Sequence, residues 1–527
     1  MTWPHWIVVP IVLPLMTGAL LVLVGRQAPV WARRISLTSV LALLGVAILL
    51  LRQADGGAVQ AYLLANWRAP FGIALALDRL SALMLVLTAL VGLASLLYAT
   101  GGDDRHGAHF HALLQFQLMG LNGAFLTADL FNLFVFFEVL LIASYGLLLQ
   151  GAGAARLKAS IHYVSFNLAG SALFLIAVAL LYGLTGTLNM ADLAERVPRV
   201  GADRALLVHS AALLLLTVFC IKAALLPLNF WLPDTYRAAS APVAALFAIM
   251  TKVGVYAVLR TATLIFGESG GPAAHAVSPW LPVLAMATLL FGAIGALAAQ
   301  QLRGVVVSCI VASAGTLLLG VGLATPASVA ASLVYLVNST LVGAALFLLA
   351  DLIAASRGAS ADRLKPGHFD GPRAALGATF FVLAVAVAGV PPLAGFFGKA
   401  MLLQAAGNAP LAGWVIAVIL ASALLLMVAM ARSGSVLFWH PAPAGMPPAA
   451  TAGAGSSAGA RRWSLGGLVA LLVGCSVFAG PLSRYAQAAA AQLFEREAYI
   501  AAVLGARPVP PAFDVRREMR ERRKDPP

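Results

Sequence analysis

Long apolar runs follow one another along almost the whole chain, separated by short polar segments. A helix needs about 20 largely apolar residues to cross a bilayer, and the sequence holds about fourteen such runs. The period-two alternation that indicates strands is absent from them. The pattern predicts an all-α polytopic membrane protein with about 14 transmembrane helices. The expected spans are 5–25, 36–52, 80–100, 109–127, 128–150, 160–185, 205–226 with a continuation to 238, 241–265, 279–300, 304–323, 329–353, 375–404, 411–438 and 463–485.

Two segments break this pattern. Residues 53–78 contain glycine and charged residues and are expected to form an extramembrane loop, whereas residues 439–462 are rich in Pro, Ala and Gly and read as a flexible linker. The predicted organisation is 1–108 for helices 1–3 with the loop, 109–265 for a first repeat (helices 4–8), 279–438 for a second repeat (helices 9–13), 439–462 for the linker, and 463–527 for a final helix and a basic C-terminal tail.

Composition supports the membrane interpretation. Hydrophobic residues make up 61% of the chain and charged residues 10%, against about 25% charged residues in soluble domains. The net charge of +14 is spread over loops between apolar runs, which favours a membrane protein over a nucleic-acid binder. Lys and Arg concentrate in alternate loops by about two to one, which predicts an outside amino terminus. The sequence contains no cysteine or histidine cluster, phosphate loop or haem motif. We therefore expect the protein to bind no metal or cofactor and not to be an enzyme.

Four ionisable residues each stand alone within a long uncharged stretch of a predicted span: Glu138, Lys222, Lys252 and Lys399. An ionisable group at mid-membrane costs about 2.5–3.5 kcal/mol even on lenient scales, so such residues usually have a function. Removal from water disfavours a charged amine, and a nearby carboxylate favours it again. One acid and three amines can therefore form a switchable proton relay. The alternatives are lysines that extend to the membrane surface, or a carboxylate–lysine pair that only joins two helices.

Two spans are predicted to be interrupted. Pro227 and Pro233 follow Lys222, and Pro391 and Pro392 precede Lys399. Each proline removes a backbone donor, and broken backbone at membrane depth persists only where protein or water satisfies it. Broken spans at matching places in two halves indicate two inverted five-helix repeats, here helices 4–8 and 9–13.

Three stretches resemble one known family. They are DLFNLFVFFEVLLIASYGLL around Glu138, LPLNFWLPDTYRAASAPVAALFAIMTKVGVYAVLR from Leu226 to Arg260, and GVPPLAGFFGKAMLL around Lys399. They resemble the antiporter-like family, which includes membrane subunits of respiratory complex I and of the multisubunit Mrp (Pha/Mnh) cation/proton antiporters. Together with VNSTLVGAALFLLADL, they are most similar to the D subunits of the Mrp branch.

The resemblance implies fourteen helices with inverted five-helix repeats, an essential glutamate at Glu138 and an ion-pair partner at Lys222. It also implies that Lys252 and Lys399 are the lysines of helix eight and of broken helix twelve. The chain departs from the family pattern where many relatives carry a helix-eleven histidine, because Asn338, Ser339 and Thr340 stand there. The central relay is then expected to use these groups and water, although Asn338 is equally suited to joining helices.

Two further residues are candidates for relay support. His162, with Ser165 and Asn167 nearby in sequence, is a candidate to extend a water chain toward Lys222, or else a structural interhelical histidine. Asp234 stands near Arg237 and is a candidate either to fix the end of the broken helix or to gate the relay.

The resulting interpretation is a proton-translocating subunit of a multisubunit Na⁺(K⁺)/H⁺ antiporter in a bacterial inner membrane. Its expected partners are other subunits, membrane lipids, protons and Na⁺ or K⁺, but no nucleic acid. One alternative is a proton-pumping subunit of a complex I-like quinone reductase or membrane hydrogenase. The other is a scaffold subunit that translocates nothing.

Overall fold

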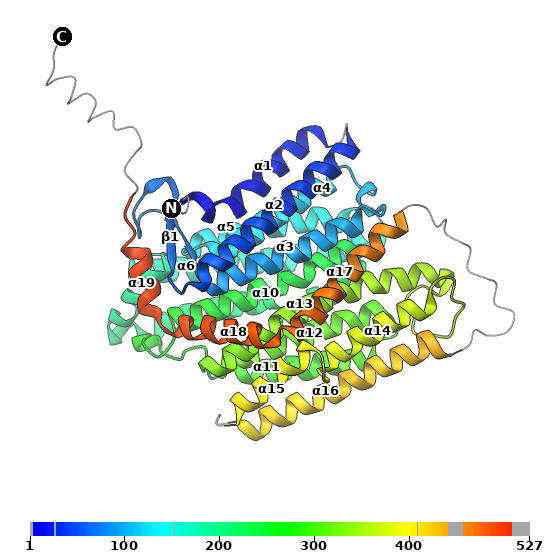
Figure 1. The fold of residues 1–527 in the computed structure, drawn as a ribbon. Coiled ribbons are helices and arrows are strands. Elements are labelled where there is room, and N and C mark those ends of the chain that lie inside the picture. The colour runs from blue at the N-terminus through cyan, green and yellow to red at the C-terminus, as the bar shows by residue number, and fades with distance from the viewer. Residues whose placement is uncertain are drawn as a thin grey trace, which may run out of the picture.

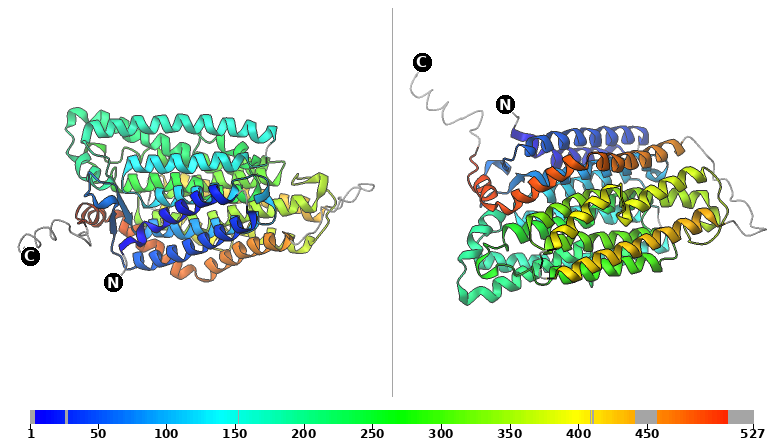
Figure 2. Two further views of the ribbon diagram at one scale, coloured as in Figure 1. Left: turned by 90° about the horizontal axis from the view of Figure 1, so that it is seen from above. Right: turned by 60° about the horizontal axis from the view of Figure 1, so that its bottom comes forward.

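In the computed structural model the chain is a bundle of helices that run nearly parallel or antiparallel to one another (Figure 1). α1 (Val9–Val24) and α2 (Pro29–Asp55) lie at one edge of the bundle and α16 (Ala412–Gly434) at the opposite edge (Figures 1 and 2). The structure describes residues 4–25, 28–151, 153–407, 409, 411–440 and 457–508. The predicted all-α polytopic membrane fold is confirmed for this part of the chain.

The remaining elements follow in chain order. The helices before the midpoint are α3 (Arg79–Ala99), α4 (Phe110–Leu126), α5 (Leu130–Leu149), α6 (Ala154–Thr185), α7 (Met190–Arg196), α8 (Ala205–Ala223), α9 (Trp231–Ala238) and α10 (Ala241–Leu264). The later helices are α11 (Leu281–Ala298), α12 (Leu302–Gly322), α13 (Pro326–Ser356), α14 (Arg373–Ala388), α15 (Ala394–Ala406), α17 (Ser457–Val477), α18 (Ala479–Phe494) and α19 (Arg496–Leu504). Short 3₁₀ turns occupy Pro4–Ile7, Leu64–Asn66, Asp103–Arg105, Val197–Arg199, Ala202–Arg204, Gly271–Ala273 and Gly358–Ser360, and a π-helical turn occupies Ser435–Trp439.

Within the described residues, 10 helices are long and apolar enough to cross a bilayer, and 11 if α17 and α18 form one span. α1 and α14 are apolar but shorter. The most apolar windows of α10 and α13 are 100% buried, whereas those of α2 and α16 are only 33% buried. A helix that is apolar all round belongs in the interior of a bundle, so α10 and α13 form its centre.

The two predicted interruptions are present. α8 ends at Ala223 and α9 begins at Trp231, so Pro227 lies in the gap, while α14 ends at Ala388 and α15 begins at Ala394, with Pro391 and Pro392 between them. Pro233 is different, because it lies in the first turn of α9 and not in the gap. A first-turn proline lacks only an amide hydrogen that would have no intrahelical partner, so it does not break α9.

A third interruption was not predicted. α17 and α18 meet at an angle of 79° around Phe478, within the predicted final span 463–485. Gly480 and Pro481 stand in the first turn of α18, directly after the bend. Proline at this position suits the start of a new helix better than the continuation of an old one.

The structure adds detail to two predicted segments. The expected loop 53–78 contains an antiparallel hairpin of β1 (Gln60–Leu63) and β2 (Ala74–Leu77). The expected linker ends early, because α17 already begins at Ser457. Residues 441–456 of the linker and the basic tail beyond residue 508 lie outside the described residues.

Three arginines from separate parts of the chain lie at one end of the bundle. Arg156 donates to the carbonyl of Ala238, and Arg303 donates to the carbonyl of the next residue, Ala239. Arg432 donates to the carbonyls of Leu297 and Ala299 at the same end. These arginines tie the ends of neighbouring helices together, and we refer to this end of the bundle as the basic face.

Candidate functional site

The three lysines predicted to be buried lie inside the bundle. Lys222 of α8 and Lys399 of α15 are each 7% exposed, and Lys252 of α10 is 0% exposed. Each amine donates a hydrogen bond to an interior group, so none extends to the membrane surface. Glu138 of α5 is half-buried. The alternative in which the lysines extend to the surface therefore does not describe this fold.

Lys222 and Glu138 both contact α6. Lys222 Nζ donates to Asn167 Oδ1 over 3.2 Å, and Ser171 Oγ donates to a Glu138 carboxylate oxygen. Asn167 and Ser171 are four residues apart and therefore share one face of α6. Among the described residues no direct ion pair joins Glu138 and Lys222. The polar face of α6 connects them instead of the direct pair that the family resemblance implies.

Protein groups form hydrogen bonds with the backbone that the helix break beside Lys222 leaves free. Ala224 adopts a left-handed conformation with φ of 58°, which ends α8. Trp231 Nε1 donates to the carbonyl of Ile221 over 2.9 Å, and Tyr163 stacks on Trp231 with ring centroids 5.2 Å apart. A small cavity of about 10 Å³ is lined by Lys222 and Asn167 together with these two aromatic residues. That volume is close to the space one water molecule needs.

Lys252 connects α10 to α12. Its amine donates to Ser313 Oγ over 2.8 Å. Ser313 also lines a second cavity of about 20 Å³, together with Tyr335, Asn338 and Ser339 of α13. This cavity reaches Val387, whose carbonyl accepts a hydrogen bond from Lys399. A small cavity with a few polar groups in its wall therefore lies between the hydrogen-bond partners of two buried lysines.

Lys399 faces the carboxyl end of α14. Its amine donates to the carbonyls of Val387 over 3.1 Å and Ala388 over 2.9 Å. Asn338 Nδ2 donates to the carbonyl of Ala386 over 3.4 Å, while Asn338 Oδ1 is buried without a hydrogen-bond partner in the structure. The last carbonyls of a helix carry partial negative charge and lack intrahelical partners. The broken end of α14 therefore provides a site for a cation.

The two breaks place their lysines differently. Lys222 lies in the last turn of the half-helix that precedes its break, whereas Lys399 lies in the half-helix that follows its break. Gly389, between α14 and α15, has φ of 73°, and a Cβ there would lie 2.6 Å from Lys399 Cδ. Glycine at this position lets the lysine side chain fold back over the broken helix end.

Other sequence-based candidates lie elsewhere. His162 is exposed on α6 and lies on a different face from Asn167. Asp234 is exposed and pairs with Arg237 over 3.2 Å, which fits the structural role and not the relay. Thr340 is buried, but its hydroxyl donates back to the carbonyl of Leu336 in its own helix. Asn338 and Ser339 do line the second cavity.

The sequence reasoning missed two contacting residues, Ser171 and Ser313. Serine is common in membrane helices, so neither residue stands out by type. Ser171 could have been found from its spacing, because it lies one helical turn beyond Asn167. Ser313 on α12 has no comparable signal, since its role depends on how α10 and α12 are rotated against each other.

Comparisons with known proteins place the chain in a family. The family described as "NADH:quinone oxidoreductase/Mrp antiporter, TM" matches residues 127–425, which include Glu138 and all three buried lysines. The D subunit of a probable K(+)/H(+) antiporter of Rhizobium meliloti is 40% identical, and the match covers 93% of this chain and 95% of that protein. The D subunit of a Na(+)/H(+) antiporter of Bacillus subtilis is 38% identical over 82% of this chain and 87% of that protein.

A solved structure supports the same assignment. A chain in the structure of the Mrp complex from Dietzia sp. superposes with a TM-score of 0.85 at 29% sequence identity. The superposition covers 96% of this chain and 100% of that one. The chain described here therefore belongs to the NADH:quinone oxidoreductase/Mrp antiporter transmembrane family, within which the curated relatives it matches are antiporter D subunits.

Proposed function

We propose that this chain is the D subunit of a multisubunit Na⁺/H⁺ or K⁺/H⁺ antiporter in a bacterial inner membrane, and that it carries the protons. The observation that supports this most strongly is the burial of three lysines, each hydrogen-bonded to an uncharged interior group. A buried amine that makes no ion pair is costly to keep charged, so it readily exchanges its proton. In this proposal the partner subunits of the complex carry the Na⁺ or K⁺ that is exchanged for the protons.

The relay runs through three stations. The first station comprises Glu138 and Lys222, joined by Ser171 and Asn167 on α6. The second is Lys252 with Ser313, and the third is Lys399 at the broken end of α14. Water in the cavity lined by Ser313 and Asn338 completes the connection between the second and third stations.

A polar face of α6 gives the first station its route to the basic face. Ser160, Tyr163, Asn167 and Ser171 are spaced three or four residues apart and are all buried. The Tyr163 hydroxyl lies 2.8 Å from that of Ser144, and Ser160 Oγ has no hydrogen-bond partner in the structure. Arg156, one turn earlier, binds the carbonyl of Ala238 at the basic face. Protons enter or leave the first station along this face of α6.

The arrangement of the helices also suggests an internal symmetry. Counting the broken pairs α8–α9, α14–α15 and α17–α18 as single spans, and including the shorter helices α1 and α4 but not α7 and α19, gives fourteen. The broken span is then the fourth of five in both α4–α10 and α11–α16. We propose that these two groups are the inverted five-helix repeats that the sequence predicts.

Two other functions make different predictions. A redox-driven proton pump, to which the family description also extends, requires electron transfer in partner subunits, and a scaffold requires no buried proton acceptors. The test is Na⁺- or K⁺-induced collapse of ΔpH in everted vesicles that contain the whole complex. Antiport independent of NADH, and lost in Glu138→Ala and Lys222→Ala with normal assembly, supports the proposal. Dependence on a reductant favours the pump, and unchanged antiport in both variants favours the scaffold.

A further inference from the structure

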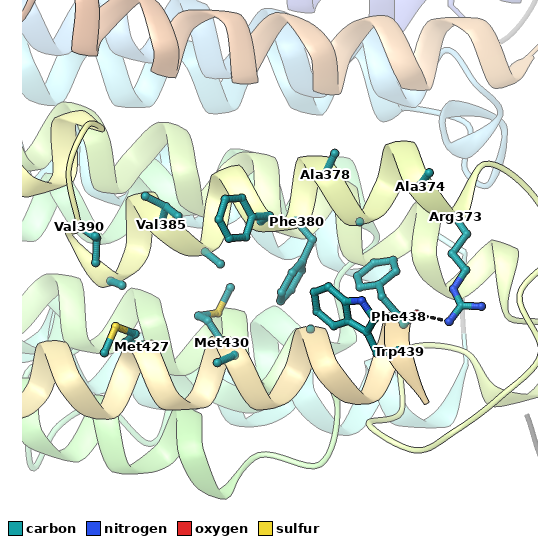
Figure 3. Close-up of a pocket in the computed structure, with 16 residues that line it drawn as sticks. Arg373, Ala374, Ala378, Phe380, Val385, Val390, Met427, Met430, Phe438 and Trp439 are labelled. Carbon is teal, nitrogen blue, oxygen red and sulfur yellow. Dashed lines mark hydrogen bonds between the residues drawn. The ribbon is translucent and has the colours of Figure 1, made fainter. Parts of the chain in front are cut away.

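A long apolar groove runs between α14 and α16 on the side of the bundle away from α1 and α2 (Figure 3). Its volume is about 910 Å³, near the upper end of the roughly 300–1,000 Å³ typical of ligand pockets. Small residues of α14 form much of its wall, and Phe380, Met427 and Met430 point into it (Figure 3). None of the four proposed relay residues lines it.

One end of the groove carries a cation. Arg373, at the first turn of α14, is exposed, and one guanidinium nitrogen donates to the carbonyl of Phe438 (Figure 3). Within the described part of the chain, no carboxylate forms an ion pair with Arg373. Trp439, which is 74% exposed, lies beside it in the groove wall. Arginine and tryptophan together are typical of the membrane–water interface.

The length of the groove matches one leaflet. The 16 residues of α14 span about 24 Å at a rise of ~1.5 Å per residue. Half of a bilayer including its headgroups is about 20–22 Å thick. With Arg373 at headgroup depth, the other end of the groove therefore lies near the bilayer midplane.

That other end lies at the helix break. Ala388 and Val390 line the groove, and the carbonyl of Ala388 accepts the hydrogen bond from Lys399. The outer side of the broken backbone thus faces the groove while its inner side holds the lysine. A chain of methylene groups in the groove would keep water away from the outer side of this break.

We propose that this groove binds an acyl chain of an anionic phospholipid from the leaflet at the basic face, with the lipid phosphate on Arg373. The unpaired cation complements the phosphate, and the apolar lining complements the chain. A transmembrane helix of a partner subunit would also bury apolar surface, but it would not by itself neutralise Arg373. The bound chain seals the break beside Lys399 on its membrane side.

The test uses the complete complex in vesicles of phosphatidylcholine with a minor fraction of phosphatidylglycerol that carries a photoreactive group in its acyl chain. Cross-links are mapped by peptide mass spectrometry. Labelling by the phosphatidylglycerol probe is expected on 377–388 and 427–434. Arg373→Gln should reduce it about fivefold, which corresponds to the ~1 kcal/mol that one cation contributes at an anionic membrane surface. Labelling by a phosphatidylcholine probe should be weaker and should not change in the variant.

Two further variants make the result decisive. Arg363→Gln removes an exposed arginine that does not line the groove and should leave labelling unchanged. Ala384→Phe fills the groove and should abolish labelling by either probe while the complex still assembles. Equal labelling by both probes in the wild type, or full labelling in Arg373→Gln, overturns the proposal. Cross-linking of this segment to a partner subunit instead of lipid overturns it as well.

Discussion

The amine of Lys399 lies 2.9 Å from the carbonyl oxygen of Ala388, the last residue of α14. This contact pairs a cation with the negative end of a half-helix inside the bundle. Removal of the amine while the carbonyls stay buried leaves those carbonyls without a donor, so Lys399 supports both the fold and the proposed relay.

Lys399→Met keeps the length of the side chain but removes its donor. We expect antiport to be lost and the complex to be destabilised by about 1–3 kcal/mol, the usual cost of unpaired buried carbonyls. Thermal unfolding and vesicle antiport measure the two effects. Lys365→Met, which alters an exposed lysine, is the control and should change neither. A Lys399→Met complex with normal antiport would contradict the role of this lysine in transport.

Gly389→Ala tests the same site from the backbone. The added Cβ would lie 2.6 Å from Lys399 Cδ, at a residue whose φ of 73° already disfavours other amino acids. We expect a loss of about 1–3 kcal/mol in stability and reduced antiport. Gly413→Ala, where a Cβ meets no atom within 4 Å, is the control and should behave like the wild type. Equal behaviour of the two variants would show that the turn at Gly389 imposes no constraint.

The substitutions Asn167→Leu and His162→Leu test the contributions of the two faces of α6 independently. Asn167 accepts the hydrogen bond from Lys222, whereas His162 is exposed. We expect Asn167→Leu to abolish most antiport and His162→Leu to leave it nearly unchanged, at equal levels of assembled complex. Vesicle antiport normalised to subunit content is the measurement. The reverse order would favour His162 as a relay residue and argue against the polar face of α6.

The cluster of Asp104, Arg33 and His111 gives a prediction about pH. Burial by itself raises the pKa of the Asp104 carboxyl, but hydrogen bonds from His111 and Arg33, together with the charge of Arg33, outweigh burial and lower it. When folding lowers the pKa of a carboxyl, the carboxylate stabilises the folded protein at pH values above its ordinary pKa of about 3.9. This stabilisation is lost as the pH falls below that value. The carboxylate joins α2 to the start of α4, with Arg33 Nη2 2.6 Å from Asp104 Oδ1.

Asp104→Asn should therefore lower the thermal unfolding temperature at pH 7. The difference from the wild type should shrink as the pH falls through 4 and below. Asp203→Asn removes a carboxylate that is 77% exposed and serves as the control, with no expected effect. A difference between Asp104→Asn and the wild type that stayed constant down to pH 3 would exclude the carboxylate charge as its cause.

The sequence predicted those features that depend on local composition. Pro227 and the pair Pro391–Pro392 marked both helix breaks, and the isolation of Lys222, Lys252 and Lys399 within apolar runs marked their burial. It did not predict contacts between helices. Asn167 faces Lys222 while His162 faces outward because of the rotation of α6, and an apolar helix surrounded by apolar neighbours gives little sign of its rotation.

The remaining differences have similar causes. The β1–β2 hairpin was read as a loop because its strands, Gln60–Leu63 and Ala74–Leu77, are too short to show a clear period. The bend between α17 and α18 was missed because the span 463–485 was taken as continuous, although Gly480 and Pro481 stand within it. The contact between Lys399 and Ala388 joins two half-helices across the break, and residue types alone do not reveal that the lysine side chain folds back onto the preceding half-helix.

Lys252 allows the most direct test of the central claim, that buried amines carry protons through this protein. It is 0% exposed, lies at the centre of the bundle and binds only Ser313 among the described residues. The measurement is cation-induced collapse of ΔpH by the assembled complex carrying Lys252→Met, in everted vesicles. The account predicts that antiport falls to the level of vesicles without the complex while assembly is normal. Wild-type antiport by a fully assembled Lys252→Met complex would contradict it.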